Sequence, residues 1–218
     1  MIGFILAAGL GTRMGELTKK TPKPLLKING ETLLDHSIAF GKSLGISEFI
    51  LNTHYLSEQI VDHVKKYSDL KIHISNEENL LGTAGGLKTG IEGIIQEENF
   101  LVMNPDILFR DFDLIALKKI IQGFNQSCLL FLAEKPEGDK NTSLALDKDQ
   151  IKFGTGNLYY IGLSVIHPKI LLKIKINQYS DLSEIFKDLS SRKMLNGVMF
   201  LGKAIDVGDK EKYFNFIS

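Results

Sequence analysis

An apolar run leads directly into a glycine-rich turn at residues 2–13, IGFILAAGLGTR. The run from Ile2 to Ala8 is short and apolar, as expected of a buried strand. Gly9 and Gly11 then let the backbone approach a ligand closely and present successive N–H groups to it. The arrangement suits the oxygens of a polyphosphate, so we predict a strand that ends in an anion site. For the turn alone, an ordinary tight turn without a ligand is an equal alternative.

Strand-like and helix-like segments alternate along the rest of the chain. Strands are expected at residues 48–54, 70–75, 99–103, 127–133 and 158–166, and helices at 32–44, 57–67, 114–123 and 181–193, with another helix beginning near Thr83. Ser57 is expected to cap the helix that it begins. Residues 136–156 are polar and rich in turn formers, and a short strand reaching Asp206 precedes a terminal helix. We predict a single α/β domain whose mixed, mostly parallel sheet is sandwiched by helices.

The composition is that of a globular protein. Its 218 residues include 26 Lys and Arg and 26 Asp and Glu, so no net positive field attracts nucleic acid. No apolar run approaches the roughly 20 residues that span a bilayer, and no signal-peptide pattern is present, which favours a cytoplasmic protein without a membrane partner. Cys128 lies in an apolar run and is expected to be buried and inert. A monomer or a homodimer is expected.

Two positively charged residues stand close to the turn in sequence. Arg13 follows it directly and carries a guanidinium that can bind phosphate oxygens in two places, while the Thr12 hydroxyl adds a donor. Lys23 is held between Pro22 and Pro24, whose fixed φ angles stiffen its approach. We predict that Arg13 and Lys23 are catalytic cations. The alternative for Lys23 is a solvated side chain without a function.

Two common phosphate-binding motifs do not fit the chain. The dinucleotide-binding fingerprint needs a third glycine where this chain has Met14, and the strand ending at His54 lacks the acidic residue that binds the ribose. Residues 82–89 nearly match a P-loop, but Leu87 replaces the glycine that precedes the lysine. A nicotinamide-dependent oxidoreductase and a P-loop enzyme are therefore disfavoured.

Two aspartates lie at the ends of predicted strands, where the ligands of open α/β sheets collect. Asp106 follows the strand at 99–103, and Asp206 ends the last strand. Mg²⁺ prefers oxygen ligands and usually keeps several waters, so two carboxylates and phosphate oxygens complete a site. The alternatives are that Asp106 caps a turn at Pro105 and that Asp206 caps the terminal helix. The histidines lack metal-ligand spacing, so structural roles are expected for them.

The segment LAAGLGTR at residues 6–13, together with Pro22-Lys23-Pro24, resembles the signature of the sugar-1-phosphate nucleotidyltransferases. Other segments with the order and spacing of that family extend over nearly the whole chain: Thr53-His54-Tyr55-Leu56, Leu81-Gly82-Thr83-Ala84-Gly85-Gly86, Asn104-Pro105-Asp106 and Ile205-Asp206-Val207-Gly208. The resemblance implies a Rossmann-like nucleotidyltransferase fold, with nucleotide binding by about residues 1–110 and sugar binding by about residues 111–218. It also implies a Mg²⁺-dependent reaction of a nucleoside triphosphate with a sugar 1-phosphate that gives a nucleotide sugar and pyrophosphate.

The resemblance assigns roles to individual residues. Arg13 is expected to hold the departing pyrophosphate, and Lys23 to contact the reacting phosphates. The nucleotide is expected to meet Leu6, Ala8, Gly9, Gly11, Thr12, Glu77, Gly82 and Thr83, the sugar to meet Asn104, Asn157 and Gly162, and the metal to bind Asp106 and Asp206. Because the attacking phosphate is already ionised, the reaction needs no protein base.

One branch of the family resembles this chain most, through the short form of the chain and GLSVIHP at residues 162–168. This branch is the bacterial N-acetylmuramate 1-phosphate uridylyltransferases of peptidoglycan recycling, so uridylyl transfer is the expected reaction. Guanylyl transfer to mannose or heptose 1-phosphate is the alternative. The family usually has glycine at the position of Pro105 and threonine or serine at that of Asp209, and these departures leave open a catalytically inactive binding module. Glu134-Lys135-Pro136 resembles a substrate-binding triplet but comes a strand too early, so no role is expected for it.

Overall fold

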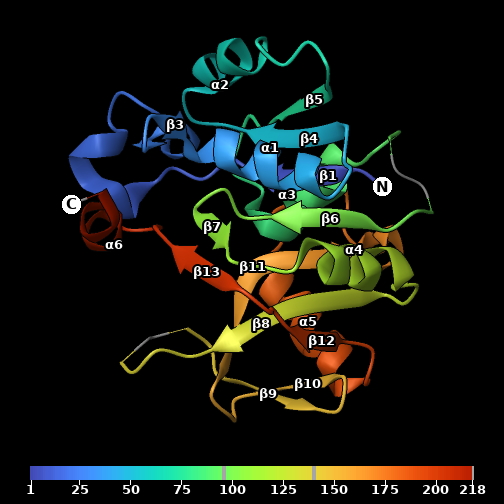
Figure 1. Cartoon of the computed structure of the whole chain (residues 1–218). Coiled ribbons are helices and arrows are strands. Elements are labelled where there is room, and N and C mark those ends of the chain that lie inside the picture. The colour runs from blue at the N-terminus through green and yellow to red at the C-terminus, as the bar shows by residue number, and fades with distance from the viewer. Residues whose placement is uncertain (95–96, 139–140, 218) are drawn as a thin grey trace.

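The computed structural model describes residues 1–94, 97–138 and 141–217 (Figure 1). Its main feature is a nine-stranded mixed sheet in the order β5-β4-β1-β6-β11-β8-β12-β10-β9. These strands are β1 (Gly3–Leu6), β4 (Glu48–Thr53), β5 (Lys71–Asn76), β6 (Phe100–Met103), β8 (Cys128–Glu134), β9 (Leu144–Asp147), β10 (Gln150–Phe153), β11 (Leu158–Ile166) and β12 (Asn196–Met199). Figure 1 shows β5 and the β9–β10 hairpin at opposite ends of the sheet. The predicted α/β fold with a mixed sheet is confirmed.

The N-terminal half of the sheet is parallel and buried on both faces. β1 pairs in parallel with β4 and β6, and β4 pairs in parallel with β5. Phe4 packs on one face and Ile5 on the other, which is the alternation that a pleated strand imposes. Both side chains are fully buried. Because helices cover both faces, the strand is a continuous apolar run rather than an alternating one.

Helices cover both faces of the sheet, as predicted. The face of Ile5 is covered by α1 (Leu33–Ser43), α2 (Ser57–Val64) and α4 (Leu114–Gly123). The face of Phe4 is covered by α3 (Gly82–Gly90) and α5 (Leu182–Ser191). The helix α4 and the strand β11 have the predicted bounds, and most other elements differ from prediction by a few residues at their ends.

The starts of two helices show where local sequence sets a boundary and where it does not. The Thr32 hydroxyl accepts the N–H of Asp35, and the Asp35 carboxylate accepts the N–H of Thr32, so the two residues form a reciprocal cap for α1. The predicted cap at Ser57 is wrong. Leu56 begins α2 in the left-handed conformation (φ 52°), and the Ser57 hydroxyl lies 2.9 Å from the Thr53 hydroxyl instead.

The C-terminal half of the sheet differs from the prediction. β11 runs antiparallel to β6 and β8, and only the β8–β12 pair of the described strands in this half is parallel. Parallel pairing therefore does not predominate beyond β6. The segment expected to be turn-rich contains the β9–β10 hairpin, and β12 was also not expected. These strands are four residues long, which is too short for a clear alternating pattern.

A small third core holds the glycine-rich turn against the C-terminal segment. Two 3₁₀ helices follow the turn, η1 (Thr12–Thr18) and η2 (Lys23–Leu25). A short hairpin comes next, formed by β2 (Lys27–Ile28) and β3 (Glu31–Thr32). Elsewhere in the chain, a third 3₁₀ helix, η3 (Pro168–Leu171), follows β11. β7 (Ile107–Arg110) and β13 (Lys203–Asp206) form an antiparallel ribbon, which α6 (Lys210–Ile217) follows. Met14, Leu108, Val207 and Tyr213 pack together. Met14, which breaks the dinucleotide fingerprint, therefore anchors the turn to the ribbon and to α6, and Figure 1 shows α6 beside this N-terminal segment.

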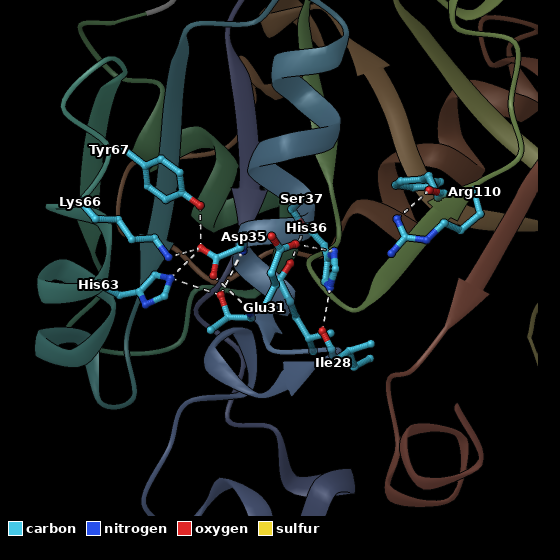
Figure 2. Close-up of polar contacts among 12 residues, drawn as sticks. Ile28, Glu31, Asp35, His36, Ser37, His63, Lys66, Tyr67 and Arg110 are labelled. Carbon is cyan, nitrogen blue, oxygen red and sulfur yellow. Dashed lines mark hydrogen bonds and ion pairs between the residues drawn. The ribbon is translucent and has the colours of Figure 1, made fainter. Parts of the chain in front are cut away.

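A polar cluster joins α1 to α2 and the residues that follow it (Figure 2). The Asp35 carboxylate accepts hydrogen bonds from His63 Nε2 at 2.7 Å and from the Tyr67 hydroxyl at 2.6 Å, and it lies 2.8 Å from Lys66 Nζ. Burial alone would raise the pKa of Asp35, but hydrogen bonds from Lys66, Tyr67, His63 and Thr32 outweigh it and hold the pKa well below its usual value. The cluster therefore favours the ionised form of this carboxylate.

Other polar side chains have the structural roles that were predicted. His36 Nε2 lies 3.2 Å from the carbonyl oxygen of Ile28, and His73 Nε2 lies 2.8 Å from the Glu48 carboxylate. Cys128 is fully buried, and burial raises the pKa of its thiol, so the thiolate nucleophile is suppressed.

Among the described residues, no three His, Cys, Asp or Glu side chains gather as metal ligands. None of the described helices combines the length and apolarity needed to cross a bilayer.

Candidate active site

A cavity of 310 Å³ opens at the carboxyl ends of β1, β4 and β6. Ligands of open α/β sheets bind at this edge. Its wall contains all the residues predicted as catalytic cations or nucleotide contacts, together with one predicted sugar contact, Asn104, and one predicted metal ligand, Asp106. The predicted catalytic and nucleotide residues in the wall are Leu6, Ala8, Gly9, Gly11, Thr12, Arg13, Lys23, Glu77, Gly82 and Thr83. The structure thus brings the two predicted catalytic cations and one of the two predicted metal ligands into a single cavity.

The turn after β1 is an open, fixed rim of this cavity. Gly9 is exposed, and no atom lies within 4 Å of the position that a Cβ would take there. Gly11 has a φ of 66°, and a Cβ on it would lie 2.8 Å from Thr18 Cγ2, so both conformation and contact require glycine. The Thr18 hydroxyl donates to Gly11 O at 3.0 Å and fixes the turn. Arg13 is exposed beside it, at the cavity wall.

Lys23 lies in the cavity wall and not in bulk solvent. Its side chain is 12% exposed, and Nζ pairs with the Asp106 carboxylate and donates to Gly208 O at 2.9 Å. Pro22 precedes it with a φ of −64°, and Pro24 is buried, so the backbone is restrained on both sides. The alternative that the Lys23 side chain is solvated and makes no ion pair is therefore wrong.

The carboxylates of Asp106 and Asp206 converge on Gly208. A Cβ on Gly208 would lie 2.8 Å from Asp106 Oδ2, 2.7 Å from Asp206 Oδ1 and 3.3 Å from Lys23 Nζ, so glycine leaves open a small space that both carboxylates and this ammonium group face. Asp206 Oδ1 accepts the N–H of Gly208 at 2.7 Å, and Oδ2 pairs with Lys212. Asp206 itself stands beside the cavity wall. Two carboxylates that face one space provide the oxygen donors that Mg²⁺ prefers, so the residues fit this ion.

The terminal helix is capped by Asp209, so the alternative reading of Asp206 as its cap is wrong. Asp209 Oδ1 accepts the N–H of Lys212 at 3.0 Å at the start of α6. Its other oxygen, Oδ2, lies 3.7 Å from Lys212 Nζ. The residue that departs from the family pattern thus has a structural task, and Asp206 remains directed at Gly208.

Glu77 is a buried carboxylate in the cavity wall and is 3% exposed. Its Oε1 accepts from Asn52 Nδ2 at 2.7 Å, and its Oε2 accepts the N–H of Leu81 at 2.9 Å. Asn52 Oδ1 in turn accepts the N–H of Ala7 at 2.8 Å. This relay ties Glu77 to the start of the glycine-rich turn. Each carboxylate oxygen still has acceptor capacity, because an ionised carboxylate offers about four lone-pair sites.

Gly82 and Thr83 begin α3 where it packs on the chain that precedes α5. Gly82 has a φ of 70°, and a Cβ on it would lie 2.6 Å from Ser180 O, so only glycine fits. Ser180 O accepts the N–H of Ala84 at 2.9 Å, and the Thr83 hydroxyl accepts the N–H of Leu182 at 2.8 Å. The wall expected to meet the base is therefore joined directly to the C-terminal half of the chain.

A second cavity of 230 Å³ adjoins the first and shares Leu6, Thr83 and Asn104 with it. The rest of its described wall is largely apolar and comprises Leu130, Asn141, Thr142, Leu144, Phe153, Tyr160, Leu182, Ser183 and Phe186. Of the predicted sugar contacts, only Asn104 lies in the described part of either wall. Gly162 supports it from behind, because Gly162 O accepts the N–H of Asn104 at 2.9 Å. Asn157 is exposed and apart from both described walls.

Several residues of the first cavity were not predicted as site residues: Ala7, Pro24, Asn52, Leu80, Pro105, Asp181 and Gly208. A signal existed for Asn52, because it is a polar residue near the carboxyl end of an apolar strand. No comparable local signal marks Asp181, since it reaches the wall only through the packing of α5 against α3.

The family model described as Nucleotidyl transferase matches residues 2–129 of the chain, which include the glycine-rich turn, Lys23, Glu77 and Asp106. The chain belongs to the nucleotidyl transferase family. For a nucleotidyl transferase, an open glycine-rich turn beside two cations and two carboxylates is a coherent set of groups. The match ends within β8, so β13, the strand that carries Asp206, lies outside it.

This nucleotidyl transferase is similar to longer proteins. It is 27% identical over 230 residues to the mannose-1-phosphate guanyltransferase of Candida albicans, a match that covers 99% of this chain and 63% of that protein. It is 26% identical over 227 residues to the probable mannose-1-phosphate guanylyltransferase 3 of Oryza sativa subsp. japonica, covering 98% and 63% respectively. The chain thus spans about 63% of the length of these relatives. Among solved structures, a putative glucose-1-phosphate thymidylyltransferase from Bacillus anthracis shares the fold, with a TM-score of 0.86 at 16% identity and coverage of 99% and 94%.

Proposed function

We propose that this nucleotidyl transferase condenses GTP with a sugar 1-phosphate of the mannose or heptose type and releases pyrophosphate. One observation carries the proposal: Arg13, Lys23 and Asp106 line a single cavity with the glycine-rich turn, and Asp206 shares the space at Gly208 with Asp106. The names of the relatives support guanylyl transfer. Uridylyl transfer to N-acetylmuramate 1-phosphate, and with it a role in peptidoglycan recycling, has less support from these relatives.

Glu77 supports guanine as the base. Guanine presents two neighbouring donors on one edge, the N1–H and the N2 amino group, whereas uracil presents one N–H between two carbonyl acceptors. A carboxylate only accepts hydrogen bonds, so it matches the guanine edge and repels the uracil carbonyls. The hydrogen bonds from Asn52 and Leu81 hold Glu77 in place at the cavity wall.

The chain's own residues would act by alignment and charge. The N–H groups around Gly9 and Gly11 contact the triphosphate, Arg13 binds the departing pyrophosphate, and Lys23 neutralises the α-phosphate. The sugar phosphate oxygen forms a bond to the α-phosphorus as the bond from that phosphorus to the bridging oxygen breaks. Asp106 and Asp206 would hold Mg²⁺, which supplies further positive charge to the phosphates when bound. No side chain needs to remove a proton, because the attacking phosphate is already ionised.

We assign nucleotide recognition to about residues 1–110 and sugar recognition to about residues 111–218. The second cavity supports this division, because its wall beyond Leu6, Thr83 and Asn104 comes from residues 130–186. Its apolar character suits the carbon face of a sugar ring.

The test is a matrix of GTP, UTP, CTP and ATP against mannose, heptose, glucose and N-acetylmuramate 1-phosphates with Mg²⁺, read by pyrophosphate release. GTP with mannose or heptose 1-phosphate should give the highest rate. Glu77→Gln should lower the rate with GTP relative to UTP, whereas Glu78→Gln, a change at the exposed neighbour, should leave the preference intact. Release only with UTP and N-acetylmuramate 1-phosphate would overturn the proposed substrates. A folded protein that binds nucleotide but releases no pyrophosphate would be a binding module.

A further inference from the structure

Each of the two carboxylates that face Gly208 is paired with a lysine, and the proposed reaction uses only one of these lysines. Lys23 pairs with Asp106 and belongs to the reaction. Lys212, on α6, pairs with Asp206, and their side chains are 41% and 25% exposed. The same ammonium group lies 3.7 Å from Asp209 Oδ2. Lys212 therefore stands between a carboxylate that faces the proposed metal site and one that caps its own helix.

We propose that Lys212 moves from Asp206 to Asp209 when a divalent cation binds, and thereby sets the affinity of the metal site. The inference rests on the metal site of the proposed function. A cation that binds Asp206 must compete with the ammonium group for the negative charge of that carboxylate, because Lys212 Nζ pairs with Oδ2 while the N–H of Gly208 already takes one acceptor site of Oδ1. Two cations on one carboxylate also repel each other.

Asp209 is built to receive the displaced ammonium group. Its Oδ1 is fixed by the N–H of Lys212, so Oδ2 is held within ion-pair distance of Nζ. A lysine carries three donors on a flexible four-carbon stem, so it can exchange partners without moving the helix. The exchange keeps Lys212 paired in both states and leaves Asp206 free to bind the cation.

The experiment measures Mn²⁺ binding to the nucleotide-free protein, from the electron paramagnetic resonance signal of free Mn²⁺. Lys212→Met keeps the aliphatic stem and removes the competitor, so it should bind Mn²⁺ about three- to fivefold more tightly, the size expected of a partly exposed ion pair. Asp209→Asn keeps the cap but removes the second partner, so it should bind about three- to fivefold more weakly. Lys210→Met, which removes an exposed lysine of the same helix, controls for the loss of one positive charge.

The double variant separates exchange from a general charge effect. In the Lys212→Met background, Asp209→Asn should have little remaining effect on Mn²⁺ affinity, because no ammonium group is left to relocate. An equal loss of affinity in both backgrounds would overturn the exchange. An Mn²⁺ affinity that neither single substitution changes would also overturn the exchange. That result would leave the proposed function intact. A wild-type protein that binds GTP but no Mn²⁺ would overturn both the exchange and the metal site.

Discussion

Lys23 is the residue on which the proposed chemistry depends most, because its ammonium group lies between Asp106 and the backbone of Gly208. We expect Lys23→Ala to lower kcat about 10²- to 10³-fold, by analogy with the loss of one donor from an oxyanion hole. GTP should still bind, since the glycine-rich turn is unchanged. Single-turnover pyrophosphate release measures the effect, with Lys20→Ala, an exposed lysine nearby, as the control. Normal turnover of Lys23→Ala would remove this residue from the mechanism.

Gly208 gives a second prediction at this scale, because its lack of a side chain keeps open the space between Asp106 and Asp206. Its replacement by alanine places a methyl group 2.7 Å from Asp206 Oδ1 and 2.8 Å from Asp106 Oδ2. We expect the carboxylates to be forced apart, with loss of Mn²⁺ binding and of pyrophosphate release while the fold is kept. Gly123→Ala is the matched control, since nothing lies within 4 Å of its Cβ position. Mn²⁺ affinity that Gly208→Ala leaves unchanged would show that the ion does not bind between the two aspartates.

The sequence predicts best those site residues that belong to a short sequence motif. Lys23 and Asp106 meet in the cavity as their motifs imply, and their roles stay predictions. The sugar contacts are harder, because they depend on how β11 bends. Gly162, with a φ of 76°, lies at an irregularity in the pairing of β11 with β8, and it supports Asn104 rather than lining a cavity. No spacing along the chain reveals such a bend.

At the scale of elements, the Asp35 cluster gives a testable link between α1 and α2. We expect Asp35→Asn to lower the free energy of unfolding by about 2 kcal/mol at pH 7, the range for hydrogen bonds to a buried charged group. The pKa of Asp35 in the folded protein lies below its usual value of 3.8, so the unfolded chain binds the proton first as the pH falls. Its stabilising effect is complete above that value and is lost as the pH falls through the folded pKa.

Urea unfolding of wild type and variant between pH 7 and pH 3 measures this effect. The stability difference should be constant down to about pH 5 and should shrink below about pH 4. Asp62→Asn, a change in the exposed pair with Lys65, should cost little at any of these pH values. A difference between wild type and Asp35→Asn that grows on acidification would contradict the assignment.

Elements with long or strongly apolar patterns were predictable, and the short strands at the C-terminal end of the sheet were not. The bounds of α4 and β11 follow from their patterns, because α4 repeats apolar residues at helical spacing, with Leu117 and Ile121 buried, and most of β11 is buried. β9, β10 and β12 have four residues each; β9 and β10 pair mainly with each other, and β12 pairs with β8, far along the chain. At Ser57, the hydroxyl bonds Thr53 across the strand–helix junction, a tertiary contact that outweighs the local preference for capping.

For the whole molecule, a preference for one nucleotide should appear as a larger increase in the free energy of unfolding when that nucleotide is bound. A ligand at 100 times its Kd raises the free energy of unfolding by about 2.7 kcal/mol. For a chain of 218 residues this corresponds to a rise in Tm of about 5 to 10 °C. Thermal unfolding with Mg²⁺ and equal concentrations of GTP or UTP should show the larger rise with GTP. Equal rises would mean that Glu77 does not select the base.

The hydrogen bond from Lys23 Nζ to Gly208 O joins residues that are 185 positions apart. During synthesis, a nascent chain completes the glycine-rich turn early, but it cannot close this contact until β13 and Gly208 have left the ribosome. Closing so long a loop is slow relative to local folding. On refolding from urea, helical circular dichroism should therefore return before pyrophosphate release, and simultaneous recovery would show that the ribbon docks early. The proposed enzyme would therefore stay inactive until residues 203–208 have been synthesised and have docked against Lys23.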